Sequence, residues 1–423
     1  MENNKRAQLG WVMFDWANSS YSLVIATAIF PTYFIAATAA EIPVFTLNIS
    51  NTSLYAFSVS FAYLAICFLS PVLSGVADYS GKRKFFMRIF TLVGSLSCMG
   101  LFFFSGMQNI WFGITAFILA TAGHAGSLVF YDAFLPDLVP LDQRDKLSAR
   151  GYAFGYIGSV ILLIFNIIMI QKPAWFGIVE TSYAIRLAFL SVGIWWLGFS
   201  QLSFAWLPVD KQKHSEPVNL KKGYRELQKA WNYIKDDINI RNYLFAFFCY
   251  SAGVQTVIYL ASAFAKKELH FESSQLILVI LILQLVAILG AYVFALVSKR
   301  THNLTSMKIM LFIWICICVT AFFITSHLAF YFTAGLVGLV LGGIQAISRS
   351  TYSKIIPINH PDTTCFFSFY DVLYYASIVC GTFIFGLIDQ ITGSMRLSVL
   401  SLIVFFMMGL YLLTRVQKVA VKI

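Results

Sequence analysis

The chain has 423 residues, of which 59% are hydrophobic and only 12% are Asp, Glu, Lys or Arg. Soluble domains usually carry about 25% charged residues, so this composition excludes an ordinary soluble protein and predicts a surface that faces lipid. The net charge of +11 does not indicate a nucleic-acid partner, because the basic residues lie in short segments between long apolar runs.

Twelve runs are long and apolar enough to cross a bilayer as helices, which takes about 20 residues each. In chain order they cover 11–37, 54–77, 86–107, 110–135, 151–171, 184–207, 243–264, 275–297, 308–326, 328–350, 366–388 and 396–414. The first run is too long for a signal peptide, so we expect it to remain in the mature protein. The sequence therefore predicts an all-α membrane protein with 12 transmembrane helices.

The basic residues are distributed unevenly between the two sides of this arrangement. With the N-terminus placed in the cytoplasm, the segments outside the cell hold only Lys172, Arg186, Lys266, Lys267 and Arg396. A missed or extra helix near the middle of the chain would destroy this asymmetry. The positive-inside rule therefore predicts that both termini are cytoplasmic.

The longest polar stretch, 208–242, separates an N-terminal half (1–207) from a C-terminal half (243–423), each with six predicted helices. Apolar residues recur in it every three or four positions, which predicts one amphipathic helix. Its apolar face comprises Leu220, Tyr224, Leu227, Trp231, Ile234 and Ile238. Two positions remain open for this helix: the membrane surface, where it would bind anionic lipids, or the cytoplasmic ends of the protein's own helices.

Polar side chains are costly in a bilayer, and here they recur with helical spacing on the first, fourth, seventh and tenth predicted helices. The candidates for lining a substrate cavity are Asn18, Ser22, His124, Tyr131, Gln255, Tyr259, Gln345 and Ser348. For a single hydroxyl group, a contact between helices is the simpler interpretation. His124 and Asp132 are also candidates for proton coupling, since histidine titrates near neutral pH, although a neutral, hydrogen-bonded His124 is the alternative.

Charged residues near the predicted cytoplasmic ends of the helices suggest a gate. They are Asp15, Asp132, Arg150, Arg349 and Asp371. Opposite charges at this depth would form ion pairs that break and re-form during transport, while direct substrate contact and passive ion pairing remain alternatives.

The loop between the second and third predicted helices contains a recognisable motif of gate candidates, Gly75, Asp78, Gly81, Lys82 and Arg83. Gly81 allows the chain to turn, and Asp78 is expected to accept hydrogen bonds from the N-terminus of a neighbouring helix. The pattern G-x-x-x-D-x-x-G-[RK]-[RK] in this loop resembles the signature of major facilitator transporters. The resemblance implies two six-helix pseudo-repeats, with the first, fourth, seventh and tenth helices around a central cavity.

Other stretches resemble one branch of these transporters, the unknown major facilitator-1 family, which includes the fungal autophagy-related vacuolar amino-acid effluxers. The stretches are 14–19 (FDWANS), 30–34 (FPTYF), 131–136 (YDAFLP), 148–158, 253–256 (GVQT) and 342–350 (GGIQAISRS). The chain departs from the family at Ala252, where relatives often have an acid, and at Asp132, where they often have Asn.

The resemblance and the polar faces together predict secondary active or facilitative transport of a small polar metabolite by alternating access, with efflux of an amino acid as the candidate. Efflux of an apolar or cationic compound is one alternative, and a non-transporting receptor or scaffold is another. We expect a monomer in the bacterial cytoplasmic membrane, with a small-molecule substrate, protons as a candidate coupling ion, and lipids as partners. The sequence shows no paired histidines and no metal-ligand cluster, so we expect neither an enzyme nor a metal or cofactor.

Overall fold

The computed structural model describes residues 5–44, 47–210, 220–357, 360 and 362–417. The first elements are α1 (Lys5–Ser20), η1 (Tyr21–Ile29), α2 (Phe30–Ala37), β1 (Glu41–Val44), β2 (Leu47–Ser50), α3 (Asn51–Ser80), α4 (Arg83–Gly100), η2 (Leu101–Phe103), η3 (Met107–Asn109), α5 (Ile110–Asp132), α6 (Leu135–Leu138), η4 (Leu141–Gln143), α7 (Arg144–Gln171), η5 (Pro173–Phe176) and α8 (Thr181–Trp206). The remaining elements are α9 (Leu220–Asp236), α10 (Ile238–Leu269), α11 (Ser273–Arg300), α12 (Asn303–Phe323), α13 (His327–Ile355), α14 (Thr363–Thr392) and α15 (Met395–Arg415).

Among the described residues, twelve helical segments are long and apolar enough to cross a membrane, as the sequence predicts. A helix satisfies its backbone hydrogen bonds internally, which lipid cannot do for it. The turns between the segments are short and capped locally. For example, Ser326 accepts a hydrogen bond from the backbone N–H of Ala329 at 3.2 Å and so starts α13 directly after α12.

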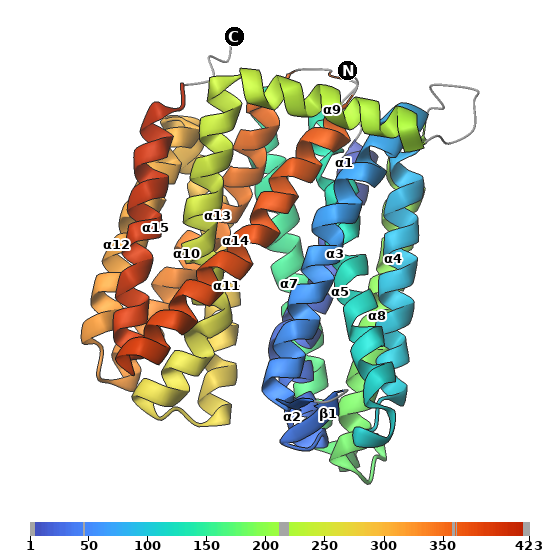
Figure 1. Ribbon diagram of the computed structural model, residues 1–423, viewed down its shortest axis with the longest axis vertical. Coiled ribbons are helices and arrows are strands. Elements are labelled where there is room, and N and C mark those ends of the chain that lie inside the picture. Colours follow the sequence, from blue (N-terminus) through green and yellow to red (C-terminus); the bar gives the residue numbers. More distant parts are fainter. Residues whose placement is uncertain (1–4, 45–46, 211–219, 358–359, 361, 418–423) are drawn as a thin grey trace.

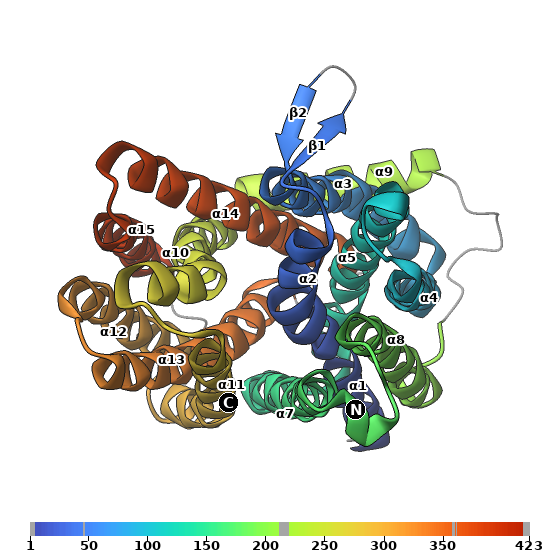
Figure 2. The ribbon, with the colours of Figure 1, turned by 90° about the horizontal axis from the view of Figure 1, so that it is seen from below.

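The helices form two upright bundles, with α1–α8 in one and α10–α15 in the other (Figure 1). The view from below shows the same division, with α7 and α11 meeting between the bundles (Figure 2). We call the end that carries both termini the near end, and the opposite end the far end. The predicted fold class of two six-helix pseudo-repeats is confirmed.

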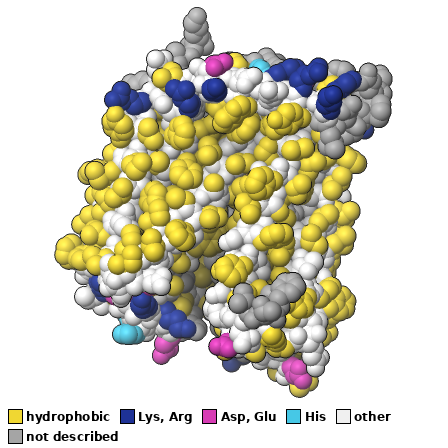
Figure 3. All heavy atoms as spheres, in the orientation of Figure 1, with side chains coloured by type: hydrophobic (Ala, Val, Ile, Leu, Met, Phe, Trp, Pro, Cys, Tyr) yellow, Lys and Arg dark blue, Asp and Glu magenta, His cyan; other side chains and the backbone are white. Residues whose placement is uncertain are grey.

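Apolar side chains cover the sides of the molecule, and Lys and Arg side chains gather at the near end (Figure 3). Large residues on the outside remain exposed, such as Phe68, Phe312 and Phe332. Such a belt cannot face water over this area, so it supports the lipid contact that the composition predicts.

A small antiparallel hairpin of β1 and β2 projects from the far end between the first two spans (Figure 2). This hairpin was not predicted from the sequence, since each strand has only four residues. The side chain of Ile42 is buried, and the backbone N–H of Asn51 donates to Ala40 at 3.0 Å, so the hairpin is fixed to the start of α3.

The amphipathic helix α9 forms where the apolar periodicity predicts it and lies across the near end of both bundles (Figure 1). It packs on the protein, because Ile234 is buried and Gly223 lies against Gly75 of α3. Tyr224 and Trp231, which belong to the same apolar face, remain more than half exposed, although the ring of Trp231 contacts that of Phe369 at a centroid distance of 5.4 Å. Contact with the protein's own helices, one of the two alternatives, is thus observed, and lipid contact of the exposed side chains stays a prediction.

Candidate functional site

A cavity lies between the two bundles and is lined by residues of α1, η1, α3, α5, α7, α10, α11, α13 and α14. Its volume is about 220 Å³, whereas one molecule of liquid water occupies about 30 Å³, so a small metabolite fits. The predicted candidates Asn18, Ser22, His124, Gln255, Tyr259, Gln345 and Ser348 all line it. Tyr131 does not line the cavity, because it is fully buried behind Asp15 and stacks on Trp11.

The polar wall contributed by the N-terminal bundle is formed in part by the π-helix η1. The sequence predicts one continuous helix over 11–37, but Pro31 cannot donate the hydrogen bond that an α-helix would make to the carbonyl of Thr27. Instead, the N–H of Phe30 bonds the carbonyl of Ile25, and the Thr27 hydroxyl donates to the carbonyl of Ser22 at 2.8 Å. Single π-helical turns are frequent at functional sites because they re-aim side chains.

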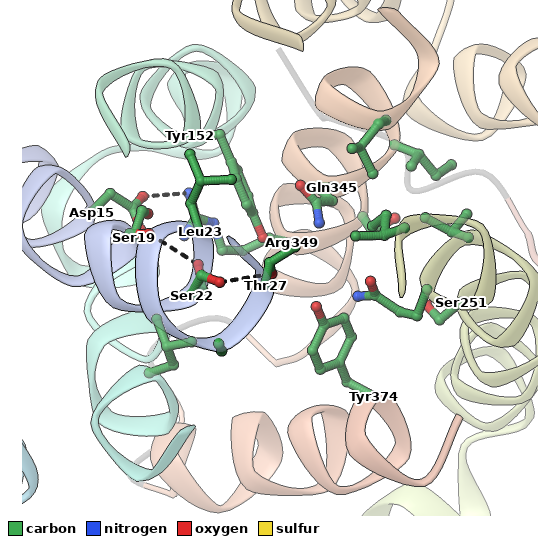
Figure 4. Close-up of a pocket in the computed structure, with 18 of the residues that line it drawn as sticks. Asp15, Ser19, Ser22, Leu23, Thr27, Tyr152, Ser251, Gln345, Arg349 and Tyr374 are labelled. Carbon is green, nitrogen blue, oxygen red and sulfur yellow. Dashed lines mark hydrogen bonds and ion pairs between the residues drawn. The ribbon is translucent and has the colours of Figure 1, made fainter. Parts of the chain in front are cut away.

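The two walls face each other across the cavity (Figure 4). Ser22 and Thr27 of η1 lie opposite Ser251, Gln345 and Tyr374 of the C-terminal bundle. The hydroxyl of Tyr156 donates to Oε1 of Gln345, so the amide links α7 to α13. The wall therefore offers amides and hydroxyl groups, which both donate and accept hydrogen bonds.

Arg349 joins the bundles at the near end of the cavity. Its guanidinium lies 3.2 Å from Asp15 Oδ2 and 3.1 Å from Asp132 Oδ1, and it donates to the hydroxyl and the carbonyl of Ser148. The rings of Trp11 and Tyr152 lie 4.6 and 4.1 Å from the guanidinium carbon. All three charges are buried, so the pairs are screened little by water.

The predicted gate residues thus fall into different settings. Asp15, Asp132 and Arg349 meet, whereas Asp371 lines the cavity without an ion pair among the described residues. Arg150 lies over the ring of Phe154 instead. The role of these residues as a gate stays a prediction.

The motif between the second and third spans ties α3 to the start of α14. Asp78 accepts hydrogen bonds from the Thr364 hydroxyl at 2.6 Å and from the backbone N–H of Cys365 at 2.9 Å, which is the helix-terminus contact predicted from the sequence. Arg83 donates to Thr364 and to Asp137. Gly81 ends α3 with a φ of 70°, a conformation that favours glycine, and Lys82 precedes α4.

A second contact between the bundles was not predicted from the sequence. Asp145, in the first turn of α7, accepts hydrogen bonds from Lys354 at 2.7 Å, Asn303 at 2.7 Å and Ser298 at 3.1 Å. The end of α11 keeps the basic pair Lys299-Arg300 but lacks the acid of the motif. In the structure an acid from the other bundle, Asp145, lies beside this end of α11, and its position follows only from the tertiary contacts.

The hydrogen bonds between the bundles are confined to the middle and the near end in the part of the chain that the structure describes. The outermost is the contact between the hydroxyl groups of Tyr63 and Tyr259, at 3.1 Å. Towards the far end the space-filling surface is hollowed between the bundles (Figure 3). The cavity is therefore closed at the near end.

His124 lies beside the rings of Tyr21 and Trp196, with centroid distances of 5.4 and 6.1 Å, and those two rings also contact each other. It reaches the cavity from α5. Its imidazole makes only these ring contacts among the described residues, so the alternative of a histidine hydrogen-bonded to a neighbouring helix is not seen. A role in proton coupling stays a prediction.

Asp362 lies just before α14 at the closed near end, beside Asp78 of α3 and Glu226 of α9. Burial, together with these two carboxylates, raises the pKa of Asp362 to about 7, although Lys229 opposes the shift. Opening the near end would expose Asp362 and return its pKa towards 3.8. Above about pH 7, ionised Asp362 therefore destabilises the closed near end. Between about pH 3.8 and pH 7, closing the near end is coupled to uptake of a proton by Asp362.

We expect acidification from about pH 8 to about pH 6 to favour closure of the near end. Spin labels introduced at the exposed positions Lys146 and Lys299, one on each bundle, would report a larger short-distance population at the lower pH. Asp362→Asn should remove this response, whereas Asp236→Asn, which changes an exposed acid of α9, should keep it. An unchanged response in Asp362→Asn would contradict the assignment.

Comparison with known proteins places these features in context. The family model described as "Vacuole effluxer Atg22 like" matches residues 3–420. The chain is 31% identical over 426 residues to the uncharacterized MFS-type transporter YxiO of Bacillus subtilis (strain 168), covering 99% of this chain and 96% of that protein. It is 26% identical over 410 residues to autophagy-related protein 22 of Saccharomyces cerevisiae (strain S288c), covering 83% and 75%.

Solved structures share the fold at low identity. The major facilitator superfamily transporter FucP in its outward conformation superposes with a TM-score of 0.71 at 14% identity, covering 98% of this chain and 99% of FucP. The human organic anion transporter MFSD10 (TETRAN) reaches a TM-score of 0.71 at 12% identity, covering 97% and 98%. These similarities concern the fold alone.

Proposed function

Because this chain belongs to the Atg22-like family of vacuole effluxers within the major facilitator superfamily, we propose that it exports a small polar metabolite, with an amino acid as the first candidate, by alternating access. Transport follows from the family and the fold. The observation that carries the proposal is the cavity between the bundles, which buried ion pairs close at the near end, while the surface between the bundles is hollowed at the far end (Figure 3).

The orientation rests on the distribution of charge. The Lys and Arg side chains gather at the near end, and the positive-inside rule assigns such an end to the cytoplasm (Figure 3). The described conformation would then be outward-facing, with the substrate cavity closed towards the cytoplasm. A bacterial cytoplasmic membrane is the proposed location, because the bacterial relative matches over almost the whole of both chains.

Export requires the near end to open. Opening must separate Arg349 from Asp15 and Asp132, and it must release Asp78 from the first turn of α14. Separated buried charges are costly unless water or substrate replaces the partner. We propose that these contacts form the cytoplasmic gate and that protons assist its opening and closing.

The chemistry of the cavity supports a small polar substrate. Gln255, Gln345 and Ser251 supply donors and acceptors to the wall, and these groups suit the carboxylate and ammonium of an amino acid. The cavity is complete within one chain, which supports a monomer as the working unit. The tyrosine-rich wall also favours a second candidate, an organic cation with apolar groups.

Counterflow in proteoliposomes tests the proposal. Proteoliposomes that contain the purified full-length protein and are loaded with a pool of unlabelled amino acids should accumulate the corresponding labelled amino acids from outside. The variant Gln345→Ala should lose most of this exchange, by about ten-fold or more, since the wall then lacks the amide that links α7 and α13. Gln201→Ala, which alters an exposed glutamine of α8, should exchange normally.

Three outcomes of this assay would change the conclusion. Exchange of organic cations without exchange of amino acids would replace the first candidate by the second. Absence of any flux in well-folded protein would favour a receptor or scaffold. Full exchange in Gln345→Ala would remove this residue from the substrate path.

A further inference from the structure

One charged group in the cavity takes no part in the ion pairs around Arg349. Asp371 of α14 is only 5% exposed, lines the cavity, and has its Oδ2 without a hydrogen-bond partner among the described residues. Asp15 and Asp132 differ from it, because both bind the guanidinium of Arg349. A buried, ionised carboxylate is strongly disfavoured unless a cation binds it, so in the absence of substrate Asp371 holds a proton, and a cation that enters can replace that proton, because the described residues supply none.

The charges that line the cavity do not balance. The charged side chains among its described lining residues are those of Asp15, Asp132, Asp371 and Arg349. The one cation is shared by two carboxylates, and the third remains. Gln284 of α11 also lines the cavity, and its buried Oε1 has no hydrogen-bond partner in the described chain, which adds a second acceptor without a donor.

Aromatic rings surround this part of the cavity. Tyr374 and Tyr375 follow Asp371 by three and four residues, which places them on the same face of α14. Tyr375 stacks on Tyr63 of α3 at a centroid distance of 4.9 Å, and the Tyr63 hydroxyl meets that of Tyr259. Ring faces attract cations, and their hydroxyl groups accept hydrogen bonds from ammonium groups.

We propose that the substrate carries a protonated amine and that the carboxylate of Asp371 binds this amine. The proposal rests on the proposed transport function and narrows its substrate class. A net excess of acceptor groups, one unpaired carboxylate and a tyrosine-lined wall all favour a cationic group over an anion. The ammonium of an amino acid and that of a simple amine share this chemistry, and the experiment below separates them.

Ligand-induced thermal shifts of the purified full-length protein would test this with three pooled probes. The first pool holds the standard L-amino acids whose side chains carry no charge, the second their amides, and the third their N-acetyl derivatives. The amides keep the protonated amine and lose the carboxylate, whereas the N-acetyl compounds keep the carboxylate and lose the charge on nitrogen. We expect the first pool to shift the wild-type protein and the third to give no shift.

The amide pool distinguishes the two sources of the amine. A shift with amino acids and amides together means that the ammonium group is the main determinant. A shift with amino acids alone means that the carboxylate is read as well, and a shift with amides alone indicates a simple amine. Each of these results supports binding of a protonated amine.

Variants assign the binding to Asp371. Asp371→Asn removes the charge at nearly constant size and should weaken binding of the amine-bearing pools by about ten-fold or more. Asp371→Glu keeps the charge and should retain part of the binding. The matched control is Asp389→Asn, on the same helix, where the acid pairs with Lys267 at the surface.

The proposal is overturned if the N-acetyl pool binds as well as the amino acids, if no amine-bearing pool shifts the protein, or if Asp371→Asn binds like the wild type. If Asp371→Asn fails to fold, the wild-type comparison of pools and the Asp371→Glu variant still decide. Flux that persists in Asp371→Asn would leave the transport function standing and remove this inference. Amine binding without any flux would support this inference and contradict the transport function.

Discussion

Replacing Arg349 with alanine is expected to abolish transport and to lower the free energy of unfolding by about 3–5 kcal/mol, because two buried carboxylates lose their common cation. The guanidinium lies within 3.2 Å of Asp15 and Asp132 and is sandwiched by the rings of Trp11 and Tyr152. Both carboxylates are almost fully buried in the closed state, so water would compensate poorly for the lost cation. Thermal or denaturant unfolding in detergent and counterflow in proteoliposomes would measure the two effects.

One further variant separates the charge of Arg349 from its geometry, and another serves as a control. Arg349→Lys keeps the charge but cannot offer the planar fork that meets two acids at once, so it should recover stability better than transport. Arg396→Ala removes a partly exposed pair with Glu268 and should cost at most about 1 kcal/mol. An Arg349→Ala protein that exchanges substrate at more than about a tenth of the wild-type rate would show that the ion pairs are not needed for the cycle.

The second large effect is expected at Gly151 of α7. A Cβ added there would lie 2.5 Å from Asp15 Oδ2, 2.9 Å from the Trp11 ring and 3.0 Å from the Arg349 guanidinium. Gly151→Val must therefore displace the ion pairs, and overpacking of this kind costs about 1–3 kcal/mol. Transport should fall by at least about ten-fold, while the rest of the bundle remains folded.

The control for this prediction is Gly198→Ala in α8, because a Cβ at Gly198 meets no atom within 4 Å. Alanine there should leave transport unchanged and stabilise the helix by up to about 1 kcal/mol. Near-normal counterflow by Gly151→Val would mean that α7 can shift without disturbing Arg349, and the tight packing around the gate would then have no functional consequence.

Much of the architecture could be predicted from the sequence because lipid imposes simple rules. Each span must be long, apolar and helical, so the apolar runs around residues such as Phe68 and Phe312 can be recognised as transmembrane helices from their length and hydrophobicity. The contact of Asp78 with the start of α14 could also be predicted, since the motif that contains it is contiguous in the chain. Helical periodicity in the first, fourth, seventh and tenth spans also predicts which polar residues line the cavity, with Tyr131 as the exception.

Other features depend on contacts between segments that are far apart in the chain. Pro31 is visible in the sequence, but whether it kinks, ends or widens a helix depends on the packing around it, and here the result is η1. Asp145 looks like an ordinary acid in the first turn of a helix until Lys354, Asn303 and Ser298 of the other bundle surround it. The hairpin of β1 and β2 is too short for a periodicity to be recognised.

The sequence by itself determined the number of spans, the asymmetry of the basic residues and the motif with Asp78, because hydrophobicity, charge and local spacing are properties of single segments. Only the tertiary structure decided which acids are paired. Asp15, Asp132 and Asp371 look alike in the sequence, yet one guanidinium reaches the first two and leaves the third alone in the cavity. The physical reason is that electrostatic partners are chosen by distance in space and by burial, and neither quantity is written in the order of residues.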